Sequence, residues 1–448
     1  MHTIPLLTHT SPSAVVAYRR GQAVTAQQFI TDANLLARRL PAGSHVLNTC
    51  ADRYHFSVGL AACLISGRVS LLPSTHTPEV IGQLTSFAPD AFCLTDDPRC
   101  DIDLPRLQLS DDLPRSAFDW DVAQIPATQL AAIVFTSGSS GIPLPYKKTW
   151  GGLVRCVRAG APRLGLLDGA AHTLIGTVPA QHMYGLESTV LLALQSGNCF
   201  SAEQPFYPAD IAAAVAAVPR PRTLVTTPVH LRTMLASEIE LPAVDLVVSA
   251  TAPLGQDLAR DVEAKFRASL IEIYGSTETG QIAMRHTAQS PVWRLWPDVR
   301  LSASNEQIFA QGGHVEQVTP LCDVIELIGN DEFLLHGRTA DLVNVAGKRS
   351  SFGYLNAQLN AIPGVIDGAF FMSDAATGST GVARLAAMVV APGMSHASLT
   401  ELLRQRIEPV FMPRPLLIVE RLPRNATGKL PQQALQGLAT LHLKSCGS

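Results

Sequence analysis

Short apolar runs alternate with amphipathic segments along most of the chain. Between residue 20 and about residue 340, the runs SHVLNTC, HTLIGTVP, RTLVTTP, DLVVSA and LIEIYG each end in a turn and lead into a helical pattern. This alternation predicts an α/β fold in which a largely parallel sheet is covered by helices. Because ligands bind beyond the carboxyl ends of such strands, the loops that follow them are the expected place for chemistry.

The pattern changes twice toward the C-terminus. From Val299 to Phe333, short strands joined by Gly, Asn and Asp turns, as in LIGNDEFLLHG, predict a small antiparallel, barrel-like unit. After Arg338, the runs VIDGAFFMSD and RLAAMVVAPG and a helix from Ser398 to Ile407 predict a separate α+β lobe of roughly 100 residues, a usual domain size. We therefore expect an N-terminal lobe at 1–338, a mobile C-terminal lobe at 339–448, and a hinge near 338–341.

Composition narrows the class of partner. The 448 residues are 47% hydrophobic, enough for large cores, and 34 basic against 37 acidic residues give a formal charge of -3. No strong field favours nucleic acid or an anionic membrane, so we expect a small molecule or a small protein. The most apolar stretches, Val58 to Gly67 and Ser188 to Gly197, are too short to cross a bilayer and predict buried helices. The N-terminus lacks the pattern of a secretory signal, so a cytoplasmic location is expected.

Cysteine and lysine usage bears on the chemistry. Eight cysteines are scattered without a C-x-x-C pair, which argues against a zinc site and a disulfide framework. There are only six lysines, at positions 147, 148, 265, 348, 429 and 444. Lysine is therefore not the ordinary surface charge of this chain, and each lysine inside a motif gains weight.

The segment AAIVFTSGSSGIPLPYKKTW, Ala131 to Trp150, carries the first candidate site. Ala131 to Phe135 predicts an apolar strand, and Thr136 to Gly141 is a loop rich in glycine and hydroxyls. Glycines allow close approach, successive N–H groups form a nest, and hydroxyls donate to phosphate oxygens. The loop lacks the Walker A pattern. An ordinary surface turn is an equally good interpretation of this loop alone.

Two further segments carry candidate groups. IYGSTETG, Ile273 to Gly280, gathers Tyr274, Thr277 and Glu278, which could stack on a base, hold a phosphate and ligate Mg²⁺. RLPRNATGKLP presents Lys429 after a glycine in a loop bracketed by prolines. Taken singly, the first is more often a polar loop than a site, and a lone lysine is usually a solvated charge.

Together, and in this order, these segments and LHGRTADLVNVAGKR resemble the adenylate-forming superfamily, which includes acyl-CoA synthetases, aryl-acid ligases, peptide-synthetase adenylation domains and firefly luciferase. The resemblance covers essentially the full length. It implies that an acid and ATP give acyl-AMP and pyrophosphate, after which a phosphopantetheine thiol takes the acyl group. It also implies ATP and Mg²⁺ as cofactors.

The resemblance implies a role for each candidate residue. Lys429 would be the mobile catalytic lysine, Thr277 would contact the α-phosphate, and Glu278 would bind Mg²⁺. The remaining nucleotide-binding candidates are Thr136, Ser137, Gly138, Ser139, Ser140, Gly141, Lys147, Lys148, Thr251, Ala252, Pro253, Tyr274, Gly275, Ser276, Asp323 and Arg338. Tyr274 would stack on adenine, and Asp323, assisted by Arg338, would hold the ribose. The acid-pocket candidates are His182, Tyr184, Gly185, Thr227, Ser249 and Gly275.

The chain departs from the family pattern at two places. Leu144 stands where a lysine usually follows the loop proline, so its phosphate role would pass to Lys147 or Lys148. Ala340 stands at the usual hinge acid, with Asp341 beside it. A hinge still needs compliant backbone more than a particular side chain.

Three hypotheses on the substrate and role stay open. The shortened large lobe and the loop variant are similar to ligases for aryl polyene pigments of the xanthomonadin type, which load hydroxybenzoate-type acids onto acyl carrier protein. The second hypothesis uses coenzyme A with a fatty or short-chain acid. The third, of another class, is a sensor that binds nucleotide or acyl ligand without turnover, for which Leu144 is the hint. Retention of Glu278, Asp323, Arg338 and Lys429 disfavours the third.

Overall fold

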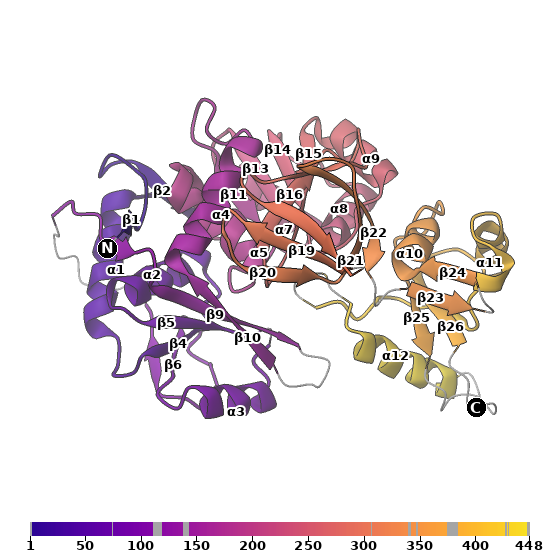
Figure 1. The fold of residues 1–448 in the computed structure, drawn as a ribbon, viewed down its shortest axis with the longest axis horizontal. Coiled ribbons are helices and arrows are strands. Elements are labelled where there is room, and N and C mark those ends of the chain that lie inside the picture. Colours follow the sequence, from indigo (N-terminus) through magenta and orange to yellow (C-terminus); the bar gives the residue numbers. More distant parts are fainter. Residues whose placement is uncertain are drawn as a thin grey trace.

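The computed structural model describes residues 2–73, 75–110, 119–137, 143–305, 307–338, 342–345, 348–373, 384–425, 428 and 430–445. Two large sheets with their helices make up most of the molecule, and the elements after β22 lie at one end of its long axis (Figure 1). This mixed architecture confirms the predicted α/β class.

The first large sheet has six strands in the order β10-β9-β5-β4-β6-β7. All neighbouring pairs are parallel except β10 with β9, which form an antiparallel hairpin. The strands are β4 (His45–Asn48), β5 (Val69–Leu72), β6 (Phe92–Thr95), β7 (Arg106–Gln108), β9 (Leu130–Ser137) and β10 (Pro143–Thr149). Helices α1 (Ala26–Arg39), α2 (Arg53–Ile65) and α3 (Pro78–Phe87) accompany it. Leu47 and Leu71 pack against Ile81 and Leu84 of α3, which buries one face of the sheet.

The second large sheet has eleven strands in the order β21-β22-β17-β16-β15-β14-β13-β11-β12-β2-β3. Its centre, from β2 through β12, β11, β13 and β14 to β15, is parallel, as the sequence predicts. The strands are β2 (Val15–Arg19), β3 (Gln22–Thr25), β11 (Thr173–Gly176), β12 (Cys199–Ser201), β13 (Arg222–Thr226), β14 (Leu246–Ser249), β15 (Ser269–Ser276), β16 (Gly280–Arg285), β17 (Trp293–Leu295), β21 (Asp323–Leu327) and β22 (Glu332–Arg338).

Helices cover this sheet and fill the space beside the first one. The apolar side chains of α7 (Pro208–Ala216), α8 (Pro228–Ala236) and α9 (Gln256–Phe266) form one core with strand residues such as Leu224 and Val247. Helix α4 (Trp150–Arg163), α5 (Met183–Gly185), the π-helix η1 (Leu186–Leu191) and α6 (Leu192–Ser196) belong to the largest core, which also includes residues of both sheets. The predicted buried helix at Ser188 to Gly197 is therefore partly a π-helix, a form frequent at functional sites.

Smaller sheets complete the described chain. A two-stranded sheet pairs β1 (Thr3–Pro5) with β8 (Gln124–Pro126). In the predicted antiparallel region, β18 (Arg300–Ser304), β19 (Gln307–Gly312) and β20 (Val315–Leu321) form a sheet of three strands, while the β21–β22 hairpin joins the large sheet. Among the described strands this unit is an open sheet and not a closed barrel.

The C-terminal elements have cores of their own. They comprise β23 (Leu342–Val345), β24 (Lys348–Ser351), α10 (Phe352–Asn360), β25 (Asp367–Ser373), β26 (Arg384–Val390), α11 (His396–Arg404), the 3₁₀ turn η4 (Pro409–Phe411), β27 (Leu416–Ile418) and α12 (Gln432–Ser445). Alternating side chains send Phe370 and Leu385 toward α10 and α11, and Phe371 and Met388 toward α12.

Two predicted boundaries were wrong. The strand expected at Ala131 to Phe135 continues to Ser137, because Thr136 and Ser137 pair with Leu144 and Pro143 across the hairpin. The helix expected at Ser398 to Ile407 spans His396 to Arg404, because the Ser395 side chain accepts from the Ser398 N–H and caps it earlier. Among the helices of the described ranges, none has the length and apolar character needed to cross a membrane.

Candidate active site

The predicted phosphate loop lies between two paired strands. Thr136 and Ser137 end β9, and their Cα partners are Leu144 and Pro143 at the start of β10. Gly138, Ser139, Ser140 and Gly141 lie outside the described residues. The structure therefore places the two ends of this loop beside each other, and the phosphate role of the loop stays a prediction.

The two lysines of β10 have different surroundings. Lys147 is exposed, whereas Lys148 is partly buried and its Nζ donates to the backbone oxygen of Glu278 at 2.8 Å. Burial lowers the pKa of Lys148, against an opposing effect of nearby acidic groups, Glu187 foremost. The structure thus brings Lys148 to the second candidate segment.

That segment is a tight turn between β15 and β16. The Ser276 N–H donates to Thr279 Oγ1, and the Thr279 N–H donates to Ser276 Oγ, each at 3.2 Å. Gly275 is required here, since a Cβ at this position would lie 2.2 Å from the Gly280 carbonyl oxygen. The turn leaves the side chains of Thr277 and Glu278 partly exposed, with Lys148 against its backbone.

Tyr274 and Asp323 meet at the edge of this turn. The Tyr274 hydroxyl donates to Asp323 Oδ2 at 2.6 Å, and its ring contacts those of Trp293 and Phe333. Asp323 opens β21 and is the Cα partner of Arg338, which ends β22. Three residues predicted to hold adenosine, separated by more than sixty positions in the chain, are therefore gathered at one place.

Three of the nucleotide-binding candidates, Thr251 to Pro253, follow β14. Thr251 has a φ of +79°, a region that β-branched residues rarely adopt, and Ala252 and Pro253 come next. The far end of the segment is fixed by Glu272, whose Oε1 accepts from the Leu254 N–H and whose Oε2 accepts from Arg285 and Thr287. Burial raises the pKa of Glu272, and these donors counteract that effect.

The acid-pocket candidates surround the carboxyl ends of β13 and β14. Thr226 and Ser249 are partners in the register of these strands, and the Tyr184 hydroxyl hydrogen-bonds the carbonyls of Thr226 and Val248 at 3.1 and 3.0 Å. Burial raises the pKa of Tyr184 well above its usual value. The Tyr184 hydroxyl is thus engaged by backbone, so only its partly exposed ring is available to a ligand.

Residues around Tyr184 fix the entry to α5. His182 is the N-cap residue of α5. Gly185 cannot be replaced without a shift, because a Cβ there would lie 1.9 Å from the Pro179 carbonyl oxygen. Ser249 is fully buried, and its Oγ has no hydrogen-bond partner within the described part of the chain.

Thr227 links this pocket to the C-terminal elements. Its Oγ1 is 2.9 Å from His230 Nδ1, and a Cβ on Gly428 would lie 3.3 Å from the same Oγ1. Lys429, the residue after Gly428, lies outside the described residues. Burial lowers the pKa of His230 to about 4, so His230 is a neutral partner of Thr227, as expected of a structural histidine.

Arg424 connects the Gly428 segment to the small sheet. Its Nε and Nη2 donate to the two carboxylate oxygens of Asp367, each at 2.7 Å, and its Nη1 donates to the Gly428 carbonyl at 2.8 Å. Arg232 of α8 lies near this pair, since the charges of Asp367 and Arg424 both affect its pKa, which burial lowers. The C-terminal elements therefore contact α8 beside the candidate pocket.

Sequence reasoning missed two buried charges that support the site. Glu272 stands alone in the apolar strand LIEIYG, and a carboxylate in such a strand is a readable signal. Arg53, 1% exposed, donates to the carbonyls of Ser201, Glu203, Gly176 and Val178. Its position at the start of an apolar helix was the available signal.

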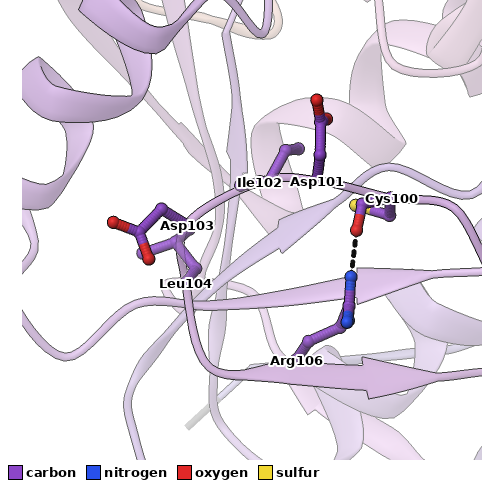
Figure 2. A pocket seen from close by; sticks show the side chains of 6 residues that line it. All are labelled: Cys100, Asp101, Ile102, Asp103, Leu104 and Arg106. Carbon is purple, nitrogen blue, oxygen red and sulfur yellow. Dashed lines mark hydrogen bonds between the residues drawn. The ribbon is translucent and has the colours of Figure 1, made fainter.

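Two surface hollows lie apart from the predicted site residues. One, of about 740 Å³, is lined by Cys100 to Leu104 and Arg106, and Figure 2 shows the Arg106 guanidinium donating to the Cys100 carbonyl. The other, of about 280 Å³, contains Arg19, Asp52, His55 and Asp96 among its lining residues. Neither includes a predicted site residue. Among the described residues, none of the His, Cys, Asp and Glu side chains gather into a group that could hold a metal ion alone.

Comparison with known proteins identifies the family. The family model for AMP-binding enzymes matches residues 8–305. The 4-coumarate–CoA ligase of Rhodobacter capsulatus is 31% identical over 304 residues, which cover 68% of this chain and 74% of that protein.

Solved structures share the fold. ATP-bound MatB from Rhodopseudomonas palustris superposes with a TM-score of 0.80 at 18% identity, covering 96% of this chain and 97% of that one. The o-succinylbenzoate CoA synthetase of Bacillus subtilis, in complex with its acyl-adenylate intermediate, has a TM-score of 0.80 at 16% identity, covering 97% and 99%. With the family model spanning most of its length, this chain belongs to the AMP-binding enzymes, the adenylate-forming acid–thiol ligases.

Proposed function

We propose that the protein activates a small aromatic acid of the hydroxybenzoate type with ATP and transfers the acyl group to the phosphopantetheine thiol of an acyl carrier protein. In the first step, a carboxylate oxygen bonds to the α-phosphorus while the bond to the β-phosphate bridging oxygen breaks, giving acyl-AMP and pyrophosphate. In the second, the thiol sulfur bonds to the acyl carbon, the thiol loses its proton, and AMP leaves.

One observation carries the adenylation proposal: Gly428 lies against Thr227, beside the ends of β13 and β14. In this proposal Lys429, the next residue in the chain, would act between the acid and the α-phosphate. A carboxylate and an α-phosphate repel each other, and an ammonium bridging them lowers that barrier. No general base is needed, because the attacking carboxylate is ionised near pH 7.

The nucleotide would lie along the Tyr274–Asp323 pair. The Tyr274 ring would stack on the base, Asp323 and Arg338 would hold the ribose, and Thr251 to Pro253 would line the adenine. Thr136 to Gly141 would hold the outer phosphates through hydroxyls and backbone N–H groups, without the lysine that Leu144 replaces.

The donor set fits Mg²⁺ that is shared with the nucleotide. Glu278 offers one partly exposed carboxylate, and Mg²⁺ is commonly held by one or two carboxylates together with phosphate oxygens and waters. When bound, the ion would neutralise charge on the departing pyrophosphate. Thr277 and the turn backbone would orient the α-phosphate beside it.

We also propose that residues 339–448 move as a lobe about 338–341 between the two steps. The separate cores of the C-terminal elements support this division. In this proposal the lobe brings Lys429 to the carboxylate for adenylation and withdraws it for thiol attack.

Coenzyme A is the second candidate acceptor, and the names of the relatives favour it, since both the coumarate and the succinylbenzoate enzymes are named for coenzyme A. In this alternative the acid is fatty or short-chain. Membership of an enzyme family argues against a sensor without turnover.

Pyrophosphate exchange with a panel of benzoates and fatty acids tests the first step and ranks the acids. We expect hydroxybenzoates to support the fastest exchange; a preference for fatty acids would favour the alternative, and the absence of exchange with every acid would refute adenylation. Transfer from the adenylate to holo acyl carrier protein or to coenzyme A then identifies the acceptor.

Lys429→Ala tests the proposed cation. We expect adenylation to slow by about 100- to 1,000-fold while ATP affinity stays nearly unchanged, because the ammonium acts on charge that develops in the transition state. Exchange rates and ATP titration calorimetry measure the two effects. Arg421→Ala removes an exposed cation from the same loop region and serves as the control. An unchanged exchange rate in Lys429→Ala would remove this lysine from the mechanism.

A further inference from the structure

Lys148 connects the two large sheets at the candidate site. It belongs to β10 of the six-stranded sheet, and its Nζ bonds to the Glu278 carbonyl in the turn between β15 and β16 of the eleven-stranded sheet. Strand alternation directs Lys147 to the opposite face, where it is exposed. The neighbouring lysines of the KK pair therefore have different roles.

The Lys148 ammonium lies among acidic groups. Glu187, Glu278 and Glu316 all act on its charge, with Glu187 having the largest effect, and the thiol of Cys156 lies in the same region. Glu316 is itself engaged by Thr149 at 2.7 Å and Arg155 at 3.0 Å. Glu187, by contrast, is buried, and burial raises its pKa to about 7, against the opposing effect of the Lys148 charge. The Lys148 ammonium therefore favours the ionised form of Glu187.

Glu187 lies directly under the turn. It is 2% exposed, and a Cβ on Gly280 would lie 2.8 Å from its Oε1 and 3.3 Å from Cys156 Sγ. Gln281, next to Gly280, donates to Ser188 Oγ at 2.8 Å, so η1 and β16 are joined beside it. The turn is thus contacted by residues of η1 and, separately, by Lys148 of β10.

Withdrawing an ammonium partly from water is costly unless its bonds are well directed, so the place of Lys148 calls for a function. A charged donor makes a short, directional bond to a carbonyl, which fixes backbone position better than a neutral one. The Lys148 ammonium makes such a bond to the turn, at the Glu278 carbonyl. A shift of even 1 Å in their position would matter for catalysis.

We propose that Lys148 is a positioning residue, which sets Thr277 and Glu278 by holding the Glu278 carbonyl, and that Glu187 is the buried counter-charge that keeps its ammonium in place. The proposal rests on the proposed function only in the roles of Thr277 and Glu278. It replaces the sequence-based expectation that Lys148 reaches back to the outer phosphates.

Lys148→Met removes the charge at similar length, and Lys265→Met is the matched control. Lys265 also donates to backbone carbonyls, those of Met234, Leu235 and Ser237, but far from the turn. We expect Lys148→Met to lower kcat for adenylation by about 10- to 100-fold, as the loss of a charge-assisted hydrogen bond implies, with AMP affinity in EDTA changed by less than about threefold. Lys148→Arg should recover part of kcat, and Lys265→Met should leave kcat and KM unchanged.

Two measurements do not depend on turnover. Amide hydrogen exchange of residues 276–280 should accelerate by about tenfold in Lys148→Met and remain at the wild-type rate in Lys265→Met. In a double-mutant cycle, Glu187→Gln should lower kcat several-fold alone but little in the Lys148→Met background. If Lys148→Met does not fold, kcat and amide exchange of residues 276–280 can be compared with wild type in Glu187→Gln and Lys148→Arg instead.

The outcomes separate this inference from the proposed function. If wild-type protein exchanges pyrophosphate but Lys148→Met keeps wild-type kcat and amide exchange, the positioning role is refuted and the function stands. If no acid supports exchange in wild type, the function fails, and amide exchange at 276–280 still decides whether Lys148 holds the turn.

Discussion

Tyr274 and His230 are two side chains at this site whose positions are fixed by hydrogen bonds and ring contacts. The Tyr274 hydroxyl orients Asp323, while its ring is held by Trp293 and Phe333. His230 is held neutral between Thr227 and Thr177 and lies edge-on to Phe206. For each residue, a substitution of similar size can test the contribution of its polar group apart from that of its packing.

Tyr274→Phe keeps the ring and removes the hydroxyl. We expect KM for ATP to rise by about tenfold with kcat little changed, because Asp323 loses the bond that orients it toward the ribose while the stacking surface remains. Steady-state exchange kinetics measure both constants. Tyr354→Phe, at an exposed position of α10, is the control. A fall in kcat with unchanged KM would contradict this role.

His230→Gln tests the buried neutral histidine. The folded pKa of about 4 lies below the unfolded value of 6.5, so the stability from His230 is present above pH 6.5 and is lost as the pH falls through 4. Between about pH 7 and about pH 5, wild type should lose about 2 kcal/mol of unfolding free energy through this group. Urea titrations at the two pH values should show a correspondingly smaller loss in His230→Gln.

The exposed His396, at the start of α11, provides the comparison for that measurement. His396→Gln should lose as much stability as wild type over the same interval. Equal losses in all three proteins would show that His230 does not titrate as its surroundings predict.

At the scale of elements, the apolar runs were sufficient to predict the parallel strands, because each run is buried on both faces and is bounded by turn residues. The β15–β16 turn was recognised from its Gly-flanked motif. Its supports were not, since Lys148, Glu187 and Glu272 act through contacts between residues far apart in sequence. The extension of β9 to Ser137 was also missed, because it depends on pairing with β10 and not on local composition.

Gly275→Ala tests the turn as an element. The added Cβ meets backbone atoms of Gly280 and Gln281 at 2.2 and 2.8 Å, so the β15–β16 hairpin must open. We expect the unfolding free energy to fall by about 1–3 kcal/mol, measured by urea titration. Gly82→Ala in α3, where nothing lies within 4 Å, should instead raise it by about 0.5–1 kcal/mol. A Gly275→Ala protein as stable as wild type would contradict the described packing.

At the scale of the whole molecule, Arg53 joins the α2 side of the structure to the eleven-stranded sheet. Its guanidinium binds carbonyls at the ends of β11 and β12, and burial lowers its pKa to about 10. The sequence predicted the α/β fold but not this connection. The place of Arg53 at the start of an apolar helix indicates burial, but it does not indicate which four distant carbonyls the guanidinium binds.

Arg53→Met should therefore leave buried carbonyls without donors. We expect a loss of about 2–4 kcal/mol in unfolding free energy, measured by urea titration, and weaker acid binding, because Val178 leads into the segment of His182 and Tyr184. Arg99→Met, at a side chain that is 90% exposed, should change neither. Wild-type stability in Arg53→Met would show that the carbonyls find other donors.

The bonds of Arg424 to Asp367 and Gly428 have a mechanical consequence. Because Arg424 binds both Asp367 of the small sheet and the Gly428 carbonyl, Gly428 is expected to move together with that sheet. If the C-terminal lobe moves as proposed, the rate of that movement would also set the rate at which the Lys429 ammonium reaches the carboxylate. The turnover rate would then be limited by the movement of the whole C-terminal lobe, and not by the movement of one flexible side chain.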